Sequence, residues 1–339
     1  MGRVDSVGVA LQPNGQQKVA PSAGAAVFPP LTSEGIEPTI ARLEHSATIG
    51  SRAPEKQKRG GRSYGGTLEG GVRPNSVGTL FTMAFGEPVS STSVDTGVWR
   101  HIWNPVAANK NPMPAYIWTV NADDPDEIIV DEYMGAMIDE LAFTIEPNDY
   151  LLFTATIQAI RNIEGGTAPV ATRDITELWS FDEVGAEISV PSISAGAWAP
   201  IALFGWNFSY GNSLAGGDRF PLGSKEIVRL RPGNINSTVG FTAAEAIESH
   251  YRRAIADNPE LVRMRLNAKG RSLGGGNFES LALEFKAIEY NSGNVAINAE
   301  ETLEDIEIEG NAVLDGTGQL LTITLTNQHD GTKYRAPAA

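Results

Sequence analysis

Apolar and polar residues alternate along most of this chain, which predicts a mainly β protein. In residues 320–326 ("LLTITLT") threonines alternate with leucine and isoleucine, as a half-buried strand requires. Turn formers are frequent, with 36 Gly and 20 Pro overall. The alternation predicts further strands at residues 115–120, 141–145, 151–160, 203–210, 261–266 and 281–288.

Two segments have helical periodicity instead. Residues 73–88 begin with a Pro-Asn-Ser start signal and stop at Gly86 and Pro88. Residues 240–259 contain Thr242 and Glu245 at the spacing of a capping box, and end at an Asn-Pro step. Each segment has an apolar stripe along one face, for which core packing is the expected role.

The order of elements repeats between the two halves of the chain, although the residues do not. In each half a basic segment, at 52–62 or 219–231, leads into a strand, a helix and two more strands. We infer two tandem copies of a β-sandwich or barrel with a flanking helix; a single composite domain is the alternative. The predicted divisions are a flexible N-terminal arm (1–30), a first β domain (31–165), a linker (166–200), a second β domain (201–330) and a C-terminal tail (331–339).

The composition removes several kinds of chemistry from consideration. Cysteine is absent, which excludes disulfides, thiolate catalysis and Cys-based zinc sites. The four histidines are scattered without metal-ligand spacing, so neither a metal nor a cofactor is predicted. They are His45, His101, His250 and His329.

Charge and hydropathy narrow the class of partner. No apolar run approaches the roughly 20 residues that span a bilayer, and residues 1–30 lack the hydrophobic region of a secretory signal. We therefore expect synthesis in the cytoplasm and no membrane partner. The formal net charge of −15 favours repulsion of a phosphate backbone, which is not the balance of a DNA reader.

One short motif suggests catalysis. Residues 60–66 ("GGRSYGG") contain a G-x-S-x-G match centred on Ser63, the pattern of a hydrolase nucleophile elbow. An elbow needs a buried strand before the serine and a helix after it, but residues 54–60 are mostly charged or polar and repeated glycines follow. The segment is predicted to be a glycine-rich cationic hairpin or loop, and no catalytic residue is assigned.

Three stretches of the chain form a recognisable pattern. Residues 65–87 ("GGTLEGGVRPNSVGTLFTMAFGE") run from a strand through an Arg-Pro step into a helix that ends in glycine. Residues 133–160 follow as long paired strands, and residues 315–328 ("DGTGQLLTITLTNQ") as a closing strand. In these features the chain resembles tail tube proteins, also called major tail proteins, of long-tailed bacteriophages, and the likeness covers most of residues 31–328.

The resemblance implies a structural virion protein and not an enzyme. Such proteins form a β-sandwich that closes into rings with copies of itself, and the rings stack into a hollow tube through which DNA passes. Sixfold rings of single domains are usual, so a duplicated chain implies a ring of three chains and an unduplicated chain a ring of six. The implied partners are further copies of the chain, the tape-measure protein and genomic DNA transiently in the lumen, and the tail terminator and tail-tip proteins. The implied location is the virion tail, after synthesis in the cytoplasm of the host bacterium.

Two acidic stretches alternate with Ile, Leu or Val, which predicts strands with one packed and one charged face. Carboxylates that line a tube would keep DNA from adhering to its wall. A solvated outer face is an alternative, and so is a calcium site, although the regular calcium-loop pattern is missing. The candidate residues are Asp123, Asp124, Asp126, Glu127, Asp131 and Glu132 in the first stretch, and Glu300, Glu301, Glu304, Asp305, Glu307 and Glu309 in the second.

Residues 52–62 form a cationic segment in an otherwise acidic chain. Such a segment suits an acidic face of a neighbouring ring, and the resemblance assigns the equivalent hairpin to contact with the next ring. A free, solvated loop and contact with DNA are the alternatives. The candidate residues are Arg52, Lys56, Lys58, Arg59 and Arg62.

Two other classes of protein stay open. A hydrolase would use Ser63, or a pair of carboxylates in a cleft where some of the six tryptophans stack on sugars. A carbohydrate- or receptor-binding β-sandwich module would remain a discrete oligomer at high concentration, whereas a tube protein polymerises.

Overall fold

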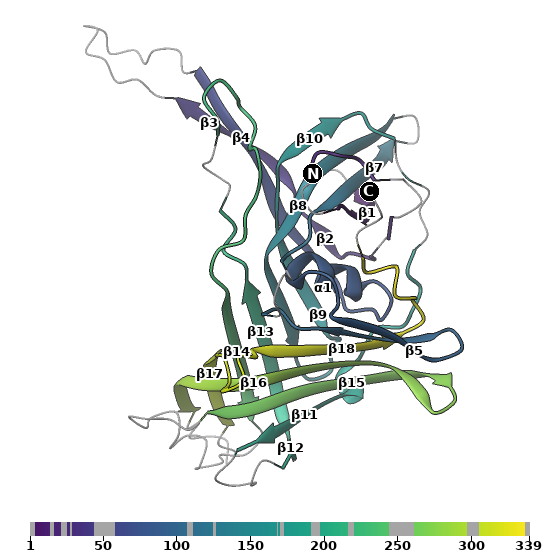
Figure 1. Ribbon diagram of the computed structural model, residues 1–339, viewed down its shortest axis with the longest axis vertical. Helices are drawn as coiled ribbons and strands as arrows, with labels where there is room; N and C mark the ends of the chain where they lie inside the picture. The colour runs from purple at the N-terminus through teal and green to yellow at the C-terminus, as the bar shows by residue number, and fades with distance from the viewer. Residues whose placement is uncertain are drawn as a thin grey trace, which may run out of the picture.

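The computed structural model describes residues 4–13, 17–21, 26–27, 29–43, 58–106, 111–124, 127–167, 169, 173–190, 197–215, 220–243, 261–296 and 305–335. Over these residues the protein is mainly β with one α-helix, as the alternation predicts. The strands pair in antiparallel fashion, and the sheet stays open instead of closing into a barrel (Figure 1).

The elements fall into two successive groups. The first comprises β1 (Val4–Leu11), β2 (Ser33–Glu34), β3 (Glu37–Leu43), β4 (Lys58–Gly71), α1 (Val77–Phe85), β5 (Ser90–Asp95), β6 (Val98–Trp103), β7 (Ala115–Asp124), β8 (Glu127–Ile145), β9 (Leu152–Ala159) and β10 (Arg161–Glu164). The second comprises the 3-10 turn η2 (Phe181–Glu183), β11 (Val184–Ser189), β12 (Ala199–Ile201), β13 (Leu203–Gly211), β14 (Asn236–Ala243), β15 (Val262–Gly274), β16 (Asn277–Ala296), β17 (Asp305–Ala312) and β18 (Leu321–Asn327).

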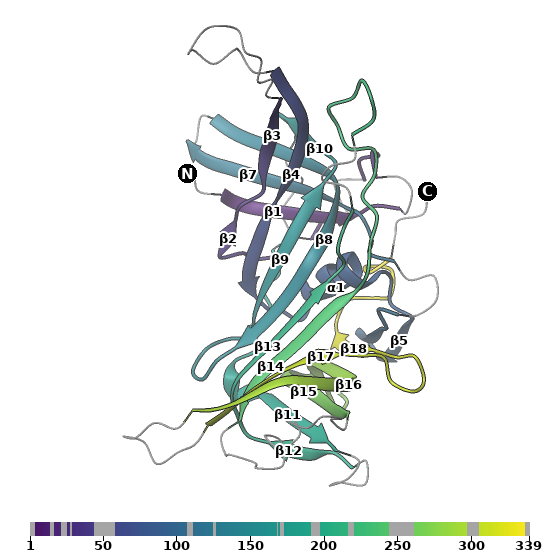
Figure 2. The same cartoon turned by 90° about the vertical axis from the view of Figure 1, so that its left-hand side faces the viewer.

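One continuous antiparallel ladder crosses the molecule. Its described strands follow the order β3, β4, β9, β8, β13, β14, β17, β16, so a strand of the second group, β13, pairs directly with a strand of the first, β8. Figure 2 shows this ladder running from the β3–β4 arm at one end of the long axis towards β16 and β17 at the other. The sheet therefore joins the two groups into a single body.

Two unusually long strands, β8 and β16, each take part in two layers. The N-terminal part of β8 pairs with β7 and β10, and its C-terminal part with β9 and β13. The N-terminal part of β16 likewise pairs with β15 and β18, and its C-terminal part with β17. Each long strand thus folds one layer over the other and encloses a core.

The pairing scheme is the same in both groups. β1, β3, β4, β7, β8, β9 and β10 pair with one another as β11, β13, β14, β15, β16, β17 and β18 do. Register irregularities recur at matching places: Ala115/Ile117 in β7 matches Val262/Met264 in β15, and Ile138/Glu140 in β8 matches Tyr290/Ser292 in β16. Because bulges are specific backbone features, their recurrence fixes the residue correspondence between the groups.

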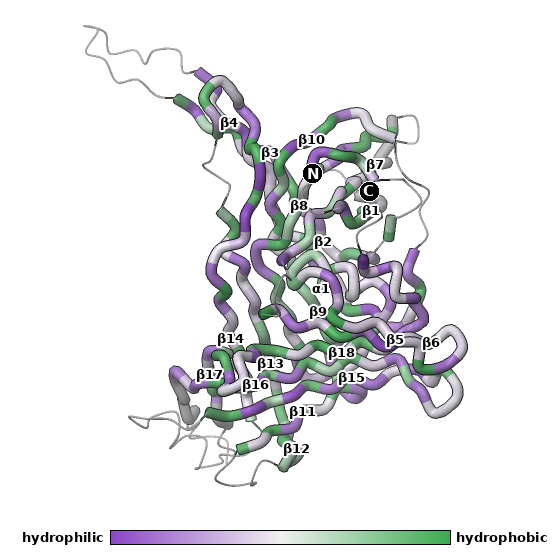
Figure 3. Tube along the Cα trace, viewed as in Figure 1, coloured by the Kyte–Doolittle hydropathy of each residue, from purple (hydrophilic) through white to green (hydrophobic). Residues whose placement is uncertain are grey.

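Hydrophilic and hydrophobic residues alternate along many of the strands (Figure 3), and the buried hydrophobic residues fill the cores between the layers. In the first group Tyr133 of β8 meets Tyr64 of β4, with ring centroids 6.5 Å apart. In the second group Phe285 of β16 packs edge-on against Phe208 of β13 at 5.0 Å. Every residue of α1 is buried against the first core.

The strands predicted at residues 115–120, 141–145, 151–160, 203–210, 261–266, 281–288 and 320–326 coincide with observed strands, and the helix predicted in residues 73–88 is α1. The acidic stretch 123–132, predicted as a strand, contains the end of β7 and the start of β8 instead; the described part of the stretch 300–310 belongs to β17. The helix predicted in residues 240–259 lies outside the described residues, except that 240–243 belong to β14. The division into domains 31–165 and 201–330 stays a prediction.

Two predicted irregular segments contain strands. The prediction of a flexible arm over residues 1–30 is wrong for residues 4–11, which form β1 and pair with β7. The prediction of a linker over residues 166–200 is wrong for residues 184–189, which form β11 and pair with β15. Both strands contain glycine and stand next to stretches rich in Gly, Pro or Ser, so their alternation is hard to distinguish from a loop.

Candidate assembly surfaces

One face of the ladder, which we define by the three rows of residues that follow, is polar and holds no lysine or arginine in these rows. Cross-strand neighbours form rows over this face, because antiparallel register places side chains opposite one another. One row is Glu69, Thr154, Ala142, Ser209, Thr238, Asn311 and Glu289. The next row is Leu152, Thr144, Asn207, Gly240 and Glu309, and a third is Thr67, Thr156, Glu140, Gly211 and Asn236. Glutamates and small neutral groups make up the polar part of the surface, without lysine or arginine.

The structure separates the predicted acidic residues. Glu307 and Glu309 are exposed on β17, at the polar face. Asp131 and Glu132 are half-buried on the N-terminal part of β8, away from that face, where Glu132 accepts a hydrogen bond from the Tyr116 hydroxyl. Asp123, Asp124, Glu127 and Asp305 lie in strands whose side chains are not described there, and Asp126, Glu300, Glu301 and Glu304 lie outside the described residues.

The predicted cationic residues lie on an arm formed by β3 and the N-terminal part of β4 (Figure 1). Lys58, Arg59 and Arg62 are exposed there, and Arg42 of β3 joins them; none forms an ion pair with another described residue. Arg52 and Lys56 lie outside the described residues. Within the described residues, the arm therefore presents positive charge without an ion-pair partner at one end of the long axis.

Carboxylates gather towards the other end. The turn between β8 and β9 carries Glu146 and Asp149, both exposed, and the amide of Phe181 donates to the Asp149 carbonyl at 3.0 Å. That bond places η2, with Asp182 and Glu183, beside the turn. The cationic residues of the arm and the carboxylates of this turn thus form two local surfaces of opposite charge.

The seam between the two groups is a closed joint, which we define as the pairing of β13 with the C-terminal part of β8. Phe208 and Phe143 lie opposite each other with ring centroids 6.3 Å apart and planes 8° from parallel. Asn212, next to β13, donates its side-chain amide to the Ala84 carbonyl at 3.0 Å and to the Ile138 carbonyl at 2.9 Å. Core packing and hydrogen bonds together hold this joint.

Two edges of the ladder are open within the described residues. No described strand pairs with the second edge of β16 over residues 292–296, nor with the outer edge of β2 and β3. On the outer edge, the Ile36 amide donates to the Glu34 carboxylate at 2.7 Å, and the Tyr133 hydroxyl donates to the Ile36 carbonyl at 2.9 Å. Pro38 has no amide to offer, so this edge is partly shielded.

Burial raises the pKa of the Glu34 carboxyl. The hydrogen bond from the Ile36 amide acts in the opposite direction, while the charges of Asp131 and Glu37 raise the pKa further. The surroundings of Glu34, the residue that shields the edge, therefore disfavour its charged carboxylate form.

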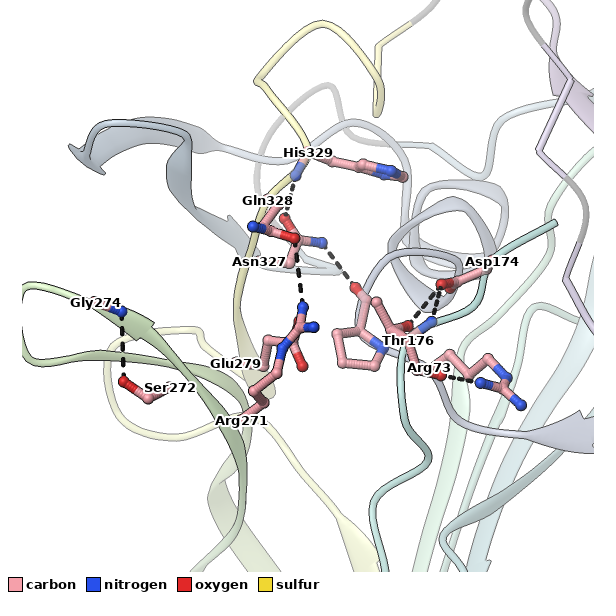
Figure 4. Close-up of polar contacts among 11 residues, drawn as sticks. Arg73, Asp174, Thr176, Arg271, Ser272, Gly274, Glu279, Asn327, Gln328 and His329 are labelled. Atoms are coloured by element: carbon pink, nitrogen blue, oxygen red, sulfur yellow. Dashed lines mark hydrogen bonds and ion pairs between the residues drawn. The ribbon is translucent and has the colours of Figure 1, made fainter. Parts of the chain in front are cut away.

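A polar cluster joins the start of α1 to the ends of β15, β16 and β18 (Figure 4). Asn327 donates its side-chain amide to the Pro74 carbonyl at 2.7 Å. Glu279, 1% exposed, pairs with Arg271 at 2.8 Å. Burial raises the pKa of Glu279, and Arg271 offsets part of that effect. The cluster ties the C-terminal strand to the first core.

Two histidines extend this cluster. His101 Nε2 lies 3.0 Å from the His329 carbonyl and Nδ1 lies 3.0 Å from the Ser91 hydroxyl. A carbonyl only accepts, so Nε2 carries the proton of the neutral ring and Nδ1 accepts from Ser91. Burial lowers the pKa of both histidines, which keeps them neutral near pH 7. His101 is fully buried, so the contact holds strands together and is closed to a substrate. His45 and His250 lie outside the described residues.

The features that would support a hydrolase are not combined in one place. Ser63 lies inside β4, paired with Thr39, and not at a strand-to-helix turn. An apolar pocket of about 420 Å³ near the end of β8 is lined by Phe181, Phe204 and Trp206, but its lining holds one carboxylate, Glu146. Over the described part of the chain, no His, Cys, Asp and Glu group could hold a metal ion, and no helix is long and apolar enough to cross a membrane.

Sequence reasoning missed the two open edges and the closed joint, because strand pairing between distant segments leaves no local pattern. Comparison with known proteins adds one finding. A family model described as phage tail tube protein matches residues 40–243, more than half of the chain. A search of curated proteins finds no match.

Proposed function

The chain belongs to the phage tail tube protein family, and from this premise we propose that it self-assembles into stacked rings that form a hollow tube through which DNA passes. The observation that carries the proposal is the continuous ladder with two open edges. A surface that joins head to tail with a different surface of the next copy closes into a ring when the rotation fits. Ring closure also removes exposed strand edges, which otherwise promote aggregation.

The polar face supplies the lining of the tube in this proposal. Lysine and arginine contacts to phosphates would hold DNA in place, and each contact strengthens binding at low salt. The face has none among its described residues, and Glu69, Glu140, Glu289, Glu307 and Glu309 add negative charge. DNA and the tape-measure protein would therefore slide past small neutral and acidic groups.

The repeated pairing scheme supports a ring of three chains. Each chain carries two copies of the arrangement, so three chains supply six copies around the ring. Rings would then stack through the oppositely charged ends, with the arm of one ring facing Glu146, Asp149, Asp182 and Glu183 of the next. Tail terminator and tail-tip proteins would close the two ends of the stack in the virion.

Negative-stain electron microscopy of the purified full chain tests this function. We expect hollow tubes or stacked rings, with threefold averages from end-on views and a mass per ring of three 36.2-kDa chains. Six chains per ring would keep the function and overturn the duplicated ring. Particles that never stack when concentrated would overturn the tube and favour a binding module.

A further inference from the structure

We propose that neighbouring copies join by pairing residues 35–39 of one copy with residues 292–296 of the next, in the register of the closed joint. This inference rests on the proposed function, because it supplies the lateral contact of the ring. The pairing is antiparallel, and both strands are backbone edges left open in the described chain. The partner is a second copy of the same protein.

The two open edges correspond to the two strands of the closed joint. In the pairing scheme β13 corresponds to β2 and β3, and β8 corresponds to β16. β13 uses one edge for β14 and the other for β8. β3, the counterpart of β13, pairs with β4 along one edge and leaves its other edge open. β16, the counterpart of β8, is open over residues 292–296, which correspond to the part of β8 that pairs with β13. The chain therefore shows one complete joint and the two separate halves of a second.

Bulges that recur in both groups set the register of the new joint. The matching bulges align Ile138 of β8 with Tyr290 of β16, so residues 140–144 correspond to residues 292–296. Pairing with β4 and β14 aligns Ile36 with Phe208. In the closed joint Phe208 lies opposite Phe143. The inferred pairs are Gly35 with Ala296, Ile36 with Val295, Glu37 with Asn294, Pro38 with Gly293, and Thr39 with Ser292.

The backbone groups at the open edge of β3 point in the same direction as those of β13 in the closed joint. The Asn212 amide donates to the Asp139 carbonyl at 2.6 Å, so even-numbered residues at the end of β13 face β8. The Gly35 amide donates to the Thr67 carbonyl at 2.9 Å, so odd-numbered residues face β4 and even-numbered residues face outward. Ile36 and its counterpart Phe208 are both even-numbered. The amide and carbonyl groups of β3 that face outward are therefore the counterparts of those that β13 uses to pair with β8.

Association must replace the hydrogen bond between the Ile36 amide and the Glu34 carboxylate, which shields the open edge. The Ile36 amide would exchange the Glu34 carboxylate for a carbonyl of the neighbouring copy, while its own carbonyl can accept a second bond beside that from Tyr133. Pro38 contributes one bond fewer than Tyr210 does in the closed joint. The new joint is therefore weaker in hydrogen bonds than its template, and the shield blocks pairing with unrelated edges.

Engineered disulfides test the register directly, because the chain has no cysteine of its own. Glu37→Cys with Asn294→Cys places the thiols in a non-hydrogen-bonded pair, where Cα atoms lie about 4.5 Å apart and a disulfide fits. β3 and the end of β16 lie far apart in one chain (Figure 1), so this bond can form only between copies. The matched control is Ser209→Cys with Ala142→Cys, the equivalent pair inside the closed joint.

Oxidised full-length protein is examined on non-reducing gels and by electron microscopy. We expect E37C/N294C to give covalent dimers and trimers that reduction removes, whereas S209C/A142C stays monomeric on the gel. The pair E37C/S292C, shifted by two residues, should cross-link at least tenfold less. Rings without E37C/N294C cross-links, or equal cross-linking in the shifted pair, would overturn the joint and leave the tube function intact. Protein that forms no rings in any variant would overturn both.

Discussion

The two joints of the ladder are built from corresponding strands but are completed in different ways. The joint between β8 and β13 closes inside the chain, with Phe143 and Phe208 stacked and Asn212 bonded across it. The other joint is left as two edges, and the one at Ile36 is shielded by Glu34 and Tyr133. One arrangement can thus serve as a permanent core or as a contact made on assembly, depending on which residues cover it.

The largest expected effect is at the closed joint. Phe208→Ala removes a fully buried ring that packs on Phe143 and Phe285, and should lower the free energy of unfolding by about 3–5 kcal/mol. Chemical denaturation of the unassembled chain measures this. Asn207→Ala, at the neighbouring exposed position, should change it by less than about 0.5 kcal/mol. Equal losses in both variants would mean that the joint is not a core contact.

A proline at the open edge should affect assembly and leave the fold nearly unchanged. Val295→Pro removes an amide that faces the neighbouring copy in our register, and we expect the concentration for half-assembly to rise about tenfold, near 1.4 kcal/mol per contact. Sedimentation and thermal unfolding measure the two effects separately.

Asn294→Pro is the matched control, because alternation turns that amide towards Glu307 of β17. It should lower the melting temperature of the single chain, which Val295→Pro should not. The reverse outcome would show that the register is displaced by one residue.

The smallest expected effect is at Glu34, whose carboxylate shields the open edge by accepting a hydrogen bond from the Ile36 amide. Glu34→Gln removes a charge that its surroundings disfavour, so at pH 7 the variant should be slightly more stable and should assemble a few-fold faster. The folded-state pKa is raised, so the wild-type chain gains stability below the ordinary carboxyl value near 4.5 and loses it as pH rises through the raised pKa. Glu34→Gln should lack that pH dependence. Stability against pH and light scattering provide the measurements, and an unchanged pH profile would contradict the shield.

Local pattern was enough to predict the strands, α1 and the mainly β class, because alternation and capping are properties of neighbouring residues. β1 and β11 were missed for one shared reason. Each occupies the corresponding place in its group, pairing with β7 or β15, and each is held by that partner more than by its own short pattern. Both strands were therefore missed because their pairing with a distant strand is not visible in the local sequence.

The surfaces were less accessible to sequence reasoning. The acidic stretches were treated as equivalent, yet Glu309 lies on the polar face while Glu132 bonds Tyr116 elsewhere. Most of the polar face consists of threonine, serine and asparagine from six strands, which no single segment displays. Its character depends on register, and register is set by pairing between residues far apart in the chain.

The closed joint also has a consequence for the kinetics of assembly. Because the two groups belong to one chain, one contact of every pair is intramolecular, at an effective concentration that does not fall on dilution. In the proposed ring, three chains must meet instead of six, so the rate of nucleation would scale with about the third power of protein concentration and not the sixth. A fused pair of units would then begin tubes early, while the supply of subunits is still low.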